Sequence, residues 1–362
     1  MRVLLTNNTL AARAGSELYV LDVARELKRL GHMPVAYSPA LGAVADCIRA
    51  ENIPVIDDLA ALPFRPDVIH GQHHVETMTA VASLPGVPAV YFCHGVAPGE
   101  EMPPVFPRIF RYVAVDAACR ERVVREAGAE STVRVVLNFA NLEQFRPRAP
   151  LPARPARALV FSNEAKDANF ARVVREACGR HGITLDVIGR ESGNAAAAPH
   201  ERLPHYDLVF AKARSAIESL AVGCAVVICG THGLGPMVST ANVEELRAWN
   251  FGFRTMTIPH GVDAVDAAIR GYDPADAAEV SGLVRQHADV RDAVRRIVAI
   301  YDEAILEGSR ALPDHIAEVR AMGAYLGTLD TVLKHAAHGT RIAAPPTRPP
   351  DTIALPPRSD ES

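Results

Sequence analysis

Four short polar segments hold the residues of this sequence that are best suited to bind a ligand or to take part in a reaction. The first segment follows an apolar run at the N-terminus, and in it Gly15 and Ser16 open a stretch with helical spacing. A glycine at this point lets a ligand approach the backbone, and the free amides of a helix start favour an anion. Ser16 would equally serve as a simple N-terminal cap of the helix. The segment lacks a G-x-G-x-x-G pattern, which argues against a dinucleotide site.

Histidines form the second group, and they lie at the ends of two strand-like runs. His70, His73 and His74 come at the end of the run that begins with Asp67, and His94 ends a later run. The carboxyl ends of parallel strands form the edge where open α/β sheets bind ligands. We expect neutral histidines that donate hydrogen bonds to a sugar or phosphate, unless they only satisfy loop carbonyls. A metal site is not favoured, because no acidic or cysteine ligand is spaced with them.

The third and fourth groups lie in the second half of the chain. Asn163 and Lys166 lead from an apolar run into a helix, where Lys166 would pair with a phosphate or simply be exposed. Further on, Lys212 and Arg214 precede a helix that we expect to begin at Ser215. Two cations beside the free amides of a helix start predict a cradle for a diphosphate.

Glu218 has two readings in the same segment. It follows Ser215 with the S-x-x-E spacing of a capping box, and that spacing alone favours the capping role. The other reading makes it a ligand-binding carboxylate on the first turn of the helix.

Alternation of apolar runs with helical spacing defines the elements that must position these groups. Apolar runs between helices indicate parallel strands covered on both faces. The pattern predicts a doubly wound α/β domain over residues 1–146 and, because repeated proline stops both helix and sheet, a linker over 147–157. It predicts a second such domain over 158–308, a helix over 309–342 and a disordered tail over 343–362.

The bulk composition excludes several classes of protein. The sequence is 49% hydrophobic and 22% charged, which is typical of a folded globular protein. A net charge of -4 provides no field to hold nucleic acid, so we expect no such partner. The six cysteines form no C-x-x-C pair, which favours reduced thiols. We find neither a signal peptide nor an apolar run that would cross a bilayer, and expect a cytoplasmic protein.

Taken together, the polar segments resemble those of the family-four retaining glycosyltransferases. Ala14-Gly15-Ser16-Glu17 matches three of four positions of the family's G-G-S-E-like loop, and His94-Gly95 is similar to its strand ending in histidine. The stretch from Asn138 to Pro147 is similar to P-N-G-V-D-x-x-x-F-x-P, and the stretch 218–227 to E-A-x-A-x-G-x-P-V-V. Four motifs in the family's order are much more specific than any one of them.

The resemblance implies a GT-B fold, that is, two facing Rossmann-like doubly wound domains with a C-terminal helical extension. It also implies transfer of a sugar from a nucleotide-sugar donor to a glycan, lipid-linked or small-molecule acceptor, with retention and without a metal or other cofactor. His94 and Glu218 would be catalytic, contacting the transferred sugar and the ribose or sugar hydroxyls. The remaining expected site residues are, for the donor diphosphate, Gly15, Asn163, Lys166, Lys212, Arg214 and Ser215, and, for the acceptor or sugar, Ser16, His70, His73 and Asn138.

Two departures from the family pattern leave alternatives open. Phe210 stands where the family often has the first of two glutamates. Ser162-Asn163 stand near the position at which the family usually has an arginine, and that arginine is missing here. A catalytically silent GT-B protein that binds a nucleotide, glycan or partner is therefore one alternative. A sugar-nucleotide epimerase on the same two-domain plan is another, and it would need acid/base carboxylates that the sequence does not identify.

One segment of the first domain is a candidate surface for weak peripheral membrane contact. In residues 102–112, aromatic and apolar residues alternate with two arginines. Aromatic side chains that enter a bilayer interface, flanked by cations that meet anionic headgroups, give reversible attachment. The alternative places the aromatic residues of the segment in the core.

Overall fold

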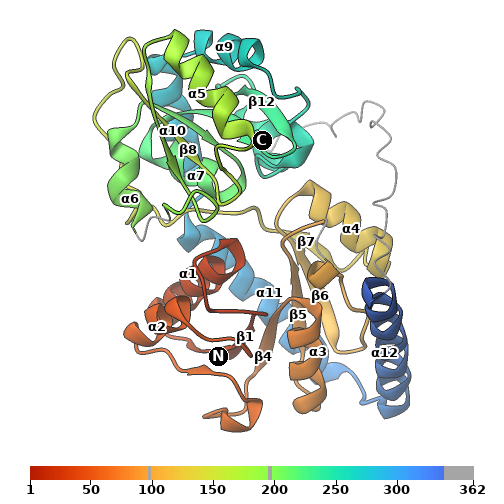
Figure 1. The fold of residues 1–362 in the computed structure, drawn as a ribbon. Coiled ribbons are helices and arrows are strands. Elements are labelled where there is room, and N and C mark those ends of the chain that lie inside the picture. The colour runs from red at the N-terminus through yellow and green to blue at the C-terminus, as the bar shows by residue number, and fades with distance from the viewer. Residues whose placement is uncertain (97–98, 195–197, 338–362) are drawn as a thin grey trace, which may run out of the picture.

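Two α/β domains, each built around its own sheet, make up the structure, a computed structural model that describes residues 1–96, 99–194 and 198–337 (Figure 1). The predicted disordered tail, residues 343–362, lies outside the described residues. Among the helices of the described ranges, none combines the length and the apolar character needed to cross a membrane.

The first domain contains a parallel sheet of seven strands in the order β3-β2-β1-β4-β5-β6-β7. Its strands are β1 Arg2–Thr6, β2 Met33–Tyr37, β3 Val55–Ile56, β4 Val68–Gln72, β5 Ala89–Cys93, β6 Ile109–Ala114 and β7 Val133–Val135. Helices α1 Gly15–Arg29, α2 Ala43–Ala50, α3 His74–Ser83 and α4 Ala117–Ala127 connect them. The order reverses between β1 and β4, and ligands bind at such a switch point in open α/β sheets.

The second domain has a five-stranded sheet in the order β12-β11-β10-β8-β9. Its strands are β8 Arg157–Phe161, β9 Thr184–Ile188, β10 Leu208–Ala211, β11 Ala225–Gly230 and β12 Gly233–Met237. Helices α5 Phe170–Arg180, α6 Pro199–Arg202, α7 Ala213–Val222, α8 Val243–Ala248, α9 Val262–Arg270 and α10 Pro274–His287 accompany the sheet. Only β12 pairs antiparallel, and its sequence Gly-Leu-Gly-Pro-Met carries little strand signal.

The chain passes between the domains twice, and the two passages lie side by side. The amide of Ala140 donates to the carbonyl of Ala288 at 2.9 Å, and the amide of Val290 donates to the carbonyl of Ala140 at 3.1 Å. The proline-rich linker is docked on the second domain, because Arg148 is ion-paired with Asp207 at 2.9 Å. The hydrogen-bonded pair of passages therefore forms the connection between the domains.

The helix after the second passage packs on the first domain, which differs from the predicted domain boundary at residue 308. In α11 (Val290–Arg310), Val294, Ile297 and Tyr301 belong to the same core cluster as the first strand and α1. An amphipathic pattern shows that one face of a helix is covered but does not show which domain covers it. By packing, the second domain ends before α11.

The last helix, α12 (His315–Ala337), also lies against the first domain (Figure 1). Glu318 accepts a hydrogen bond from Arg108 at 3.0 Å, and the Tyr325 hydroxyl lies 2.9 Å from Nδ1 of His74. One face of α12 is thus fixed to the first domain, within the range 309–342 where the sequence predicts a helix.

Candidate functional site

Loops and helix starts at the carboxyl edges of the two sheets face each other across the domain junction. Arg214, near the start of α7, forms an ion pair with Asp22 of α1. Arg254, after β12, forms another with Glu121 of α4 at 2.9 Å. Because α1, α4 and α7 each follow the carboxyl end of a strand, these contacts bring together the edges at which open α/β sheets bind ligands.

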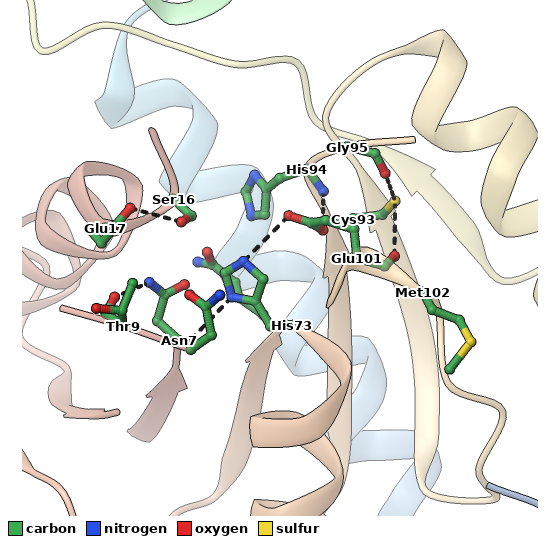
Figure 2. A network of polar contacts seen from close by, with 12 residues as sticks. Asn7, Thr9, Ser16, Glu17, His73, Cys93, His94, Gly95, Glu101 and Met102 are labelled. Atoms are coloured by element: carbon green, nitrogen blue, oxygen red, sulfur yellow. Dashed lines mark hydrogen bonds and ion pairs between the residues drawn. The ribbon is translucent and has the colours of Figure 1, made fainter. Parts of the chain in front are cut away.

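His94 lies at the first-domain edge (Figure 2), and its ring packs against that of Tyr19. The ring centroids are 4.5 Å apart at 71°, and the backbone amide of His94 donates to Oε2 of Glu101 at 2.9 Å. Burial lowers the pKa of His94 to about 3, so the ring is neutral at pH 7. Its Nε2 is buried and has no hydrogen-bond partner among the described residues.

His73 and Glu101 form a buried pair beside His94 (Figure 2). The amide of Asn8 donates to Nδ1 of His73 at 3.2 Å, which leaves the proton of the neutral ring on Nε2, 3.6 Å from Oε1 of Glu101. Burial lowers the pKa of His73 to about 4 and raises that of Glu101 to about 7. His73 has a φ of 58°, a conformation that costs about 1–3 kcal/mol and is concentrated at functional sites.

Glu101 is a site residue that the sequence reasoning missed. It lies in a one-turn helix, Gly99–Glu101, after β5, and no motif marks it. Its carboxylate binds the backbone of one histidine and faces the ring of another, so it holds both in place. Only the return of this loop over the sheet edge brings it there.

Four buried polar atoms at this edge have no partner among the described residues. They are Oδ1 of Asn7, the hydroxyl of Tyr19, Oε1 of Gln72 and Nε2 of His94. Buried polar groups in folded proteins are nearly always hydrogen-bonded, so such atoms indicate where a ligand or water supplies the partner. The group is uncharged at neutral pH, which suits the hydroxyls of a sugar better than a phosphate.

His70 and His74 are structural residues instead of ligand contacts. His70 is fully buried, stacks on Phe92 with ring centroids 3.6 Å apart, and lies 2.5 Å from the hydroxyl of Tyr301 on α11. Its Nε2 is 3.1 Å from the Gln72 amide nitrogen, so His70 orients Gln72 from beneath. His74 is bonded to α12 as described above. Both histidines lie at the end of the strand, as predicted. Their side chains, however, contact α11 and α12, and the local sequence does not show these contacts.

The helix start in the first domain is open, as a ligand site there requires. Gly15 is the first residue of α1, and a Cβ added to it would meet nothing within 4 Å. Ser16 does not cap the helix; its hydroxyl donates to Oε2 of Glu17 at 3.0 Å. Asn138 lies partly exposed in the segment after β7.

At the second-domain edge, Lys212 is bound to a carboxylate. Its ammonium group donates to both oxygens of Glu164 at 2.8 Å, and the hydroxyl of Thr231 also donates to Glu164 at 2.8 Å. Burial raises the pKa of Glu164, but the bonds from Lys212 outweigh it and lower that pKa below its usual value. Glu164 lies between Asn163 and Lys166 in the sequence, but nothing in this segment indicates that it pairs with Lys212.

Arg214 lies between two carboxylates and joins the domains. Its Nε donates to Oε1 of Glu218 at 2.7 Å, and a terminal nitrogen pairs with Asp22. Burial alone would lower the pKa of Arg214, but the two carboxylates raise it, so the guanidinium stays charged. For Glu218, burial raises the pKa and the charge of Arg214 partly offsets this.

The helix at this edge begins earlier than the sequence predicts. It starts at Ala213, so Ser215 lies inside its first turn and the Ser215–Glu218 capping box is wrong. Ala213 has a φ of 49°, and its amide donates to the carbonyl of Phe251 at 3.1 Å. This tertiary hydrogen bond lets the helix begin directly after β10, which turns Glu218 toward Arg214.

The other two predicted donor residues lie at the outer part of this edge. Oδ1 of Asn163 accepts from the amide of Arg190 at 3.2 Å and thereby ties two loops together. Lys166 is about half exposed, with its ammonium 3.8 Å from Glu191. Its environment matches the alternative of an exposed lysine near a helix start.

Residues 102–112, the candidate surface for membrane contact, fit the alternative that places aromatic and apolar side chains of the segment in the core. Phe106 and Ile109 are buried in the first-domain core, and Arg108 is buried with bonds to three carbonyls and Glu318. Arg111 is paired with Glu303 and Glu307 of α11. The two arginines of the segment are thus paired with carboxylates of α11 and α12, and Val105 is its exposed large apolar residue.

Comparison with known proteins identifies the fold and nothing finer. No family model matches the chain, and no curated protein matches it. A solved glycosyltransferase from Rickettsia africae is similar with a TM-score of 0.62 at 15% identity, covering 84% of this chain and 98% of that one. HepE from Anabaena, solved with UDP-glucose, has a TM-score of 0.61 at 14% identity, covering 84% and 100%.

A third solved structure, a UDP-N-acetylglucosamine 2-epimerase, has a TM-score of 0.51 at 14% identity, covering 87% of this chain and 99% of that one. Among the described residues, no group of three or more histidine, cysteine or acidic side chains is arranged to hold a metal ion. The similarities extend over both domains at once, and the chain therefore has the GT-B fold.

Proposed function

We propose that this protein is a glycosyltransferase that moves a sugar from a nucleotide-sugar donor to a hydroxyl of a glycan, lipid-linked or small-molecule acceptor. One observation carries the proposal. Buried, neutral and unpartnered groups around His94 lie at one edge of the domain junction, and a cation-bearing helix start lies at the facing edge. A nucleotide sugar needs both surfaces, hydrogen-bonding groups for its hydroxyls and positive charge for its diphosphate.

Each edge has a defined role in this reaction. His94, Gln72 and Asn7 position the sugar and the acceptor hydroxyl. Lys212 and the amides at the start of α7 stabilise the charge that develops on the leaving diphosphate, and Glu164 gives up Lys212 to it. Arg214 and Glu218 fix α7 against α1, which sets the distance between donor and acceptor. No metal or other cofactor is required in this scheme.

The ionisation of the first-domain edge supports transfer with retention. With a pKa near 3, His94 is too weak a base to remove the acceptor proton at pH 7. In this scheme the base is an oxygen of the departing diphosphate. The acceptor hydroxyl that gives its proton to this oxygen attacks the anomeric carbon from the same face from which the diphosphate leaves. The anomeric configuration is therefore retained.

The test is incubation with a panel of nucleotide sugars and candidate acceptors, with and without a chelator. We expect release of nucleoside diphosphate that the chelator does not reduce, and a product whose anomeric configuration by NMR equals that of the donor. Binding without turnover across the panel would favour the catalytically silent GT-B alternative. An inverted product would overturn retention while leaving transfer intact.

A sugar-nucleotide epimerase is the second candidate, and Glu101 is the observation that favours it. A carboxyl group with a pKa near 7 is suited to donate and accept protons at neutral pH, and it lies next to the unpartnered group. Recovery of an altered sugar still attached to its nucleotide, and its loss in Glu101→Gln, would establish this activity.

A further inference from the structure

The outer surface of α12 and the segment just before it carry an unusual concentration of exposed apolar side chains. Eleven large apolar side chains are exposed in the described part of the chain, and five of them lie between residues 312 and 333. These five are Leu312, Ile316, Val319, Leu326 and Leu333, exposed by 54% to 91%. The inner face of the helix packs on the first domain through Glu318 and Tyr325. The five exposed side chains do not take part in this packing and are available to another surface.

Their spacing is that of a coiled-coil seam. Leu312, Val319, Leu326 and Leu333 recur every seven residues, and Ile316, Gly323 and Asp330 form a second series with the same period. The two series are offset as the a and d positions of a heptad, a pattern that keeps one stripe in contact with a partner helix. Leu312 precedes the helix, so we call the six residues of these series that lie in α12 the outer seam: Ile316, Val319, Gly323, Leu326, Asp330 and Leu333.

The charges beside the outer seam argue against a membrane as its partner. Arg320 and Lys334 are the cations near it, and Lys334 is paired with Asp330 at 2.6 Å. A helix that lies on an anionic bilayer instead carries a polar face rich in lysine and arginine.

We propose that the outer seam pairs antiparallel with the outer seam of a second copy of this chain. In one register Leu326 lies over Gly323 of the second copy, Ile316 faces Leu333, and Val319 faces Asp330. The same register places Arg320 of each copy beside Asp330 of the other. A parallel pairing would instead stack Asp330 on Asp330 and Gly323 on Gly323, which leaves like charges and an unfilled layer.

Sedimentation equilibrium of the full chain over a wide concentration range tests the pairing. We expect the mass to rise from 38.9 kDa to twice that value as concentration increases. Leu326→Asp should raise the dissociation constant of the dimer at least about ten-fold, because it buries a charge in the central layer. The matched control is Thr328→Asp, an exposed position on the same helix outside the outer seam, which should leave the constant unchanged.

The register is tested by exchanging charges. Arg320→Asp and Asp330→Arg should each weaken the dimer, and the double variant should restore it, because each creates a like-charge pair that the other removes. Failure of the double variant to recover would overturn the antiparallel register. A full chain that stays monomeric at all concentrations would overturn the pairing. This holds also if the monomer binds anionic vesicles through this helix, or if the chain dimerises only after residues 338–362 are removed.

Discussion

The histidines at the edge of the first sheet are buried, neutral and partly without partners, whereas the cations at the edge of the second sheet are bonded to carboxylates of the protein itself. At the first edge, Nε2 of His94 has no hydrogen-bond partner among the residues that the structure describes. At the second, Lys212 is bound to Glu164, and Arg214 to Asp22 and Glu218. The two edges must therefore accept their parts of a ligand by different processes.

At the neutral edge a ligand gains hydrogen bonds without breaking any within the protein. At the charged edge a diphosphate has to displace an internal anion, so the net gain is the difference between two charge-assisted contacts. Within the charged edge, Lys212 and its carboxylate are partly exposed, while Arg214 and its partners are almost covered. We infer that Lys212 exchanges its partner and that Arg214 does not.

The largest expected effect tests whether Arg214 is structural. Arg214→Ala leaves Asp22 and Glu218 buried without a counter-charge and should lower the free energy of unfolding by about 3–5 kcal/mol. Lys212→Ala, at the more exposed pair, should lower it by less than about 1 kcal/mol. Urea denaturation at pH 7 gives both values. Equal losses in the two variants would remove the distinction between the cations.

A matched variant separates the charge from the packing of this cluster. Asp22→Asn, Arg214→Met and Glu218→Gln together remove all three charges and should recover much of the stability that Arg214→Ala loses. If the triple variant is as unstable as Arg214→Ala, the loss comes from packing.

The next effect tests whether the neutral edge acts on the sugar. His94→Ala should reduce turnover by a factor of about 10²–10³, the range for removal of one positioned polar group, while affinity for free nucleoside diphosphate changes little. His74→Ala is the control, because that histidine is bonded to α12. A parallel loss of turnover and of diphosphate affinity in His94→Ala would show that the two edges do not divide the ligand as proposed.

A smaller effect tests the exchange at Lys212. Lys212→Ala should weaken binding of nucleoside diphosphate by about 1–3 kcal/mol, and Glu164→Gln should strengthen it about ten-fold, since the competing anion is gone. Calorimetric titration measures both, with Lys166→Ala as a control that should stay near wild type. Weaker binding in Glu164→Gln would mean that Glu164 positions Lys212 and does not compete for it.

The smallest effect is a change in how stability depends on pH. Between about pH 4.5 and 6.5 the unfolded chain binds protons at His73 and His94 that the folded protein does not, so these residues make stability rise with pH. Glu101, with its raised pKa, keeps in the folded state a proton that the unfolded chain has lost, so it makes stability fall with pH in the same window.

Removal of the Glu101 titration should therefore steepen the rise. In Glu101→Gln, the free energy of unfolding should increase with pH between 4.5 and 6.5 by up to about 1.4 kcal/mol per pH unit more than in wild type. Glu130→Gln, at an exposed carboxylate, serves as the control. An unchanged slope in Glu101→Gln would show that Glu101 is ionised throughout this range.

The sequence alone determined most of the strands and helices and the edges on which polar groups gather, because these depend on hydrophobic period and local turn chemistry. It placed His94 and Lys212 just after strand ends, and the structure has them there, whereas Arg214, expected in the following loop, lies in the first turn of α7. It did not determine what those side chains touch. Glu101 reaches the histidines through a loop without a motif, and the α7 helix begins at Ala213 because of a bond to a distant carbonyl.

Tertiary structure also decided which domain α11 packs on and which carboxylates pair with the cations. The two faces of an amphipathic helix are visible in sequence, but the surface that covers the apolar face is not. Asp22 and Arg214 are 192 residues apart, and no local pattern relates them. Groups that are far apart in the sequence find their partners only when the two domains pack together. For this reason only the folded chain distinguishes a cation that is available to a ligand from one that stabilises the protein.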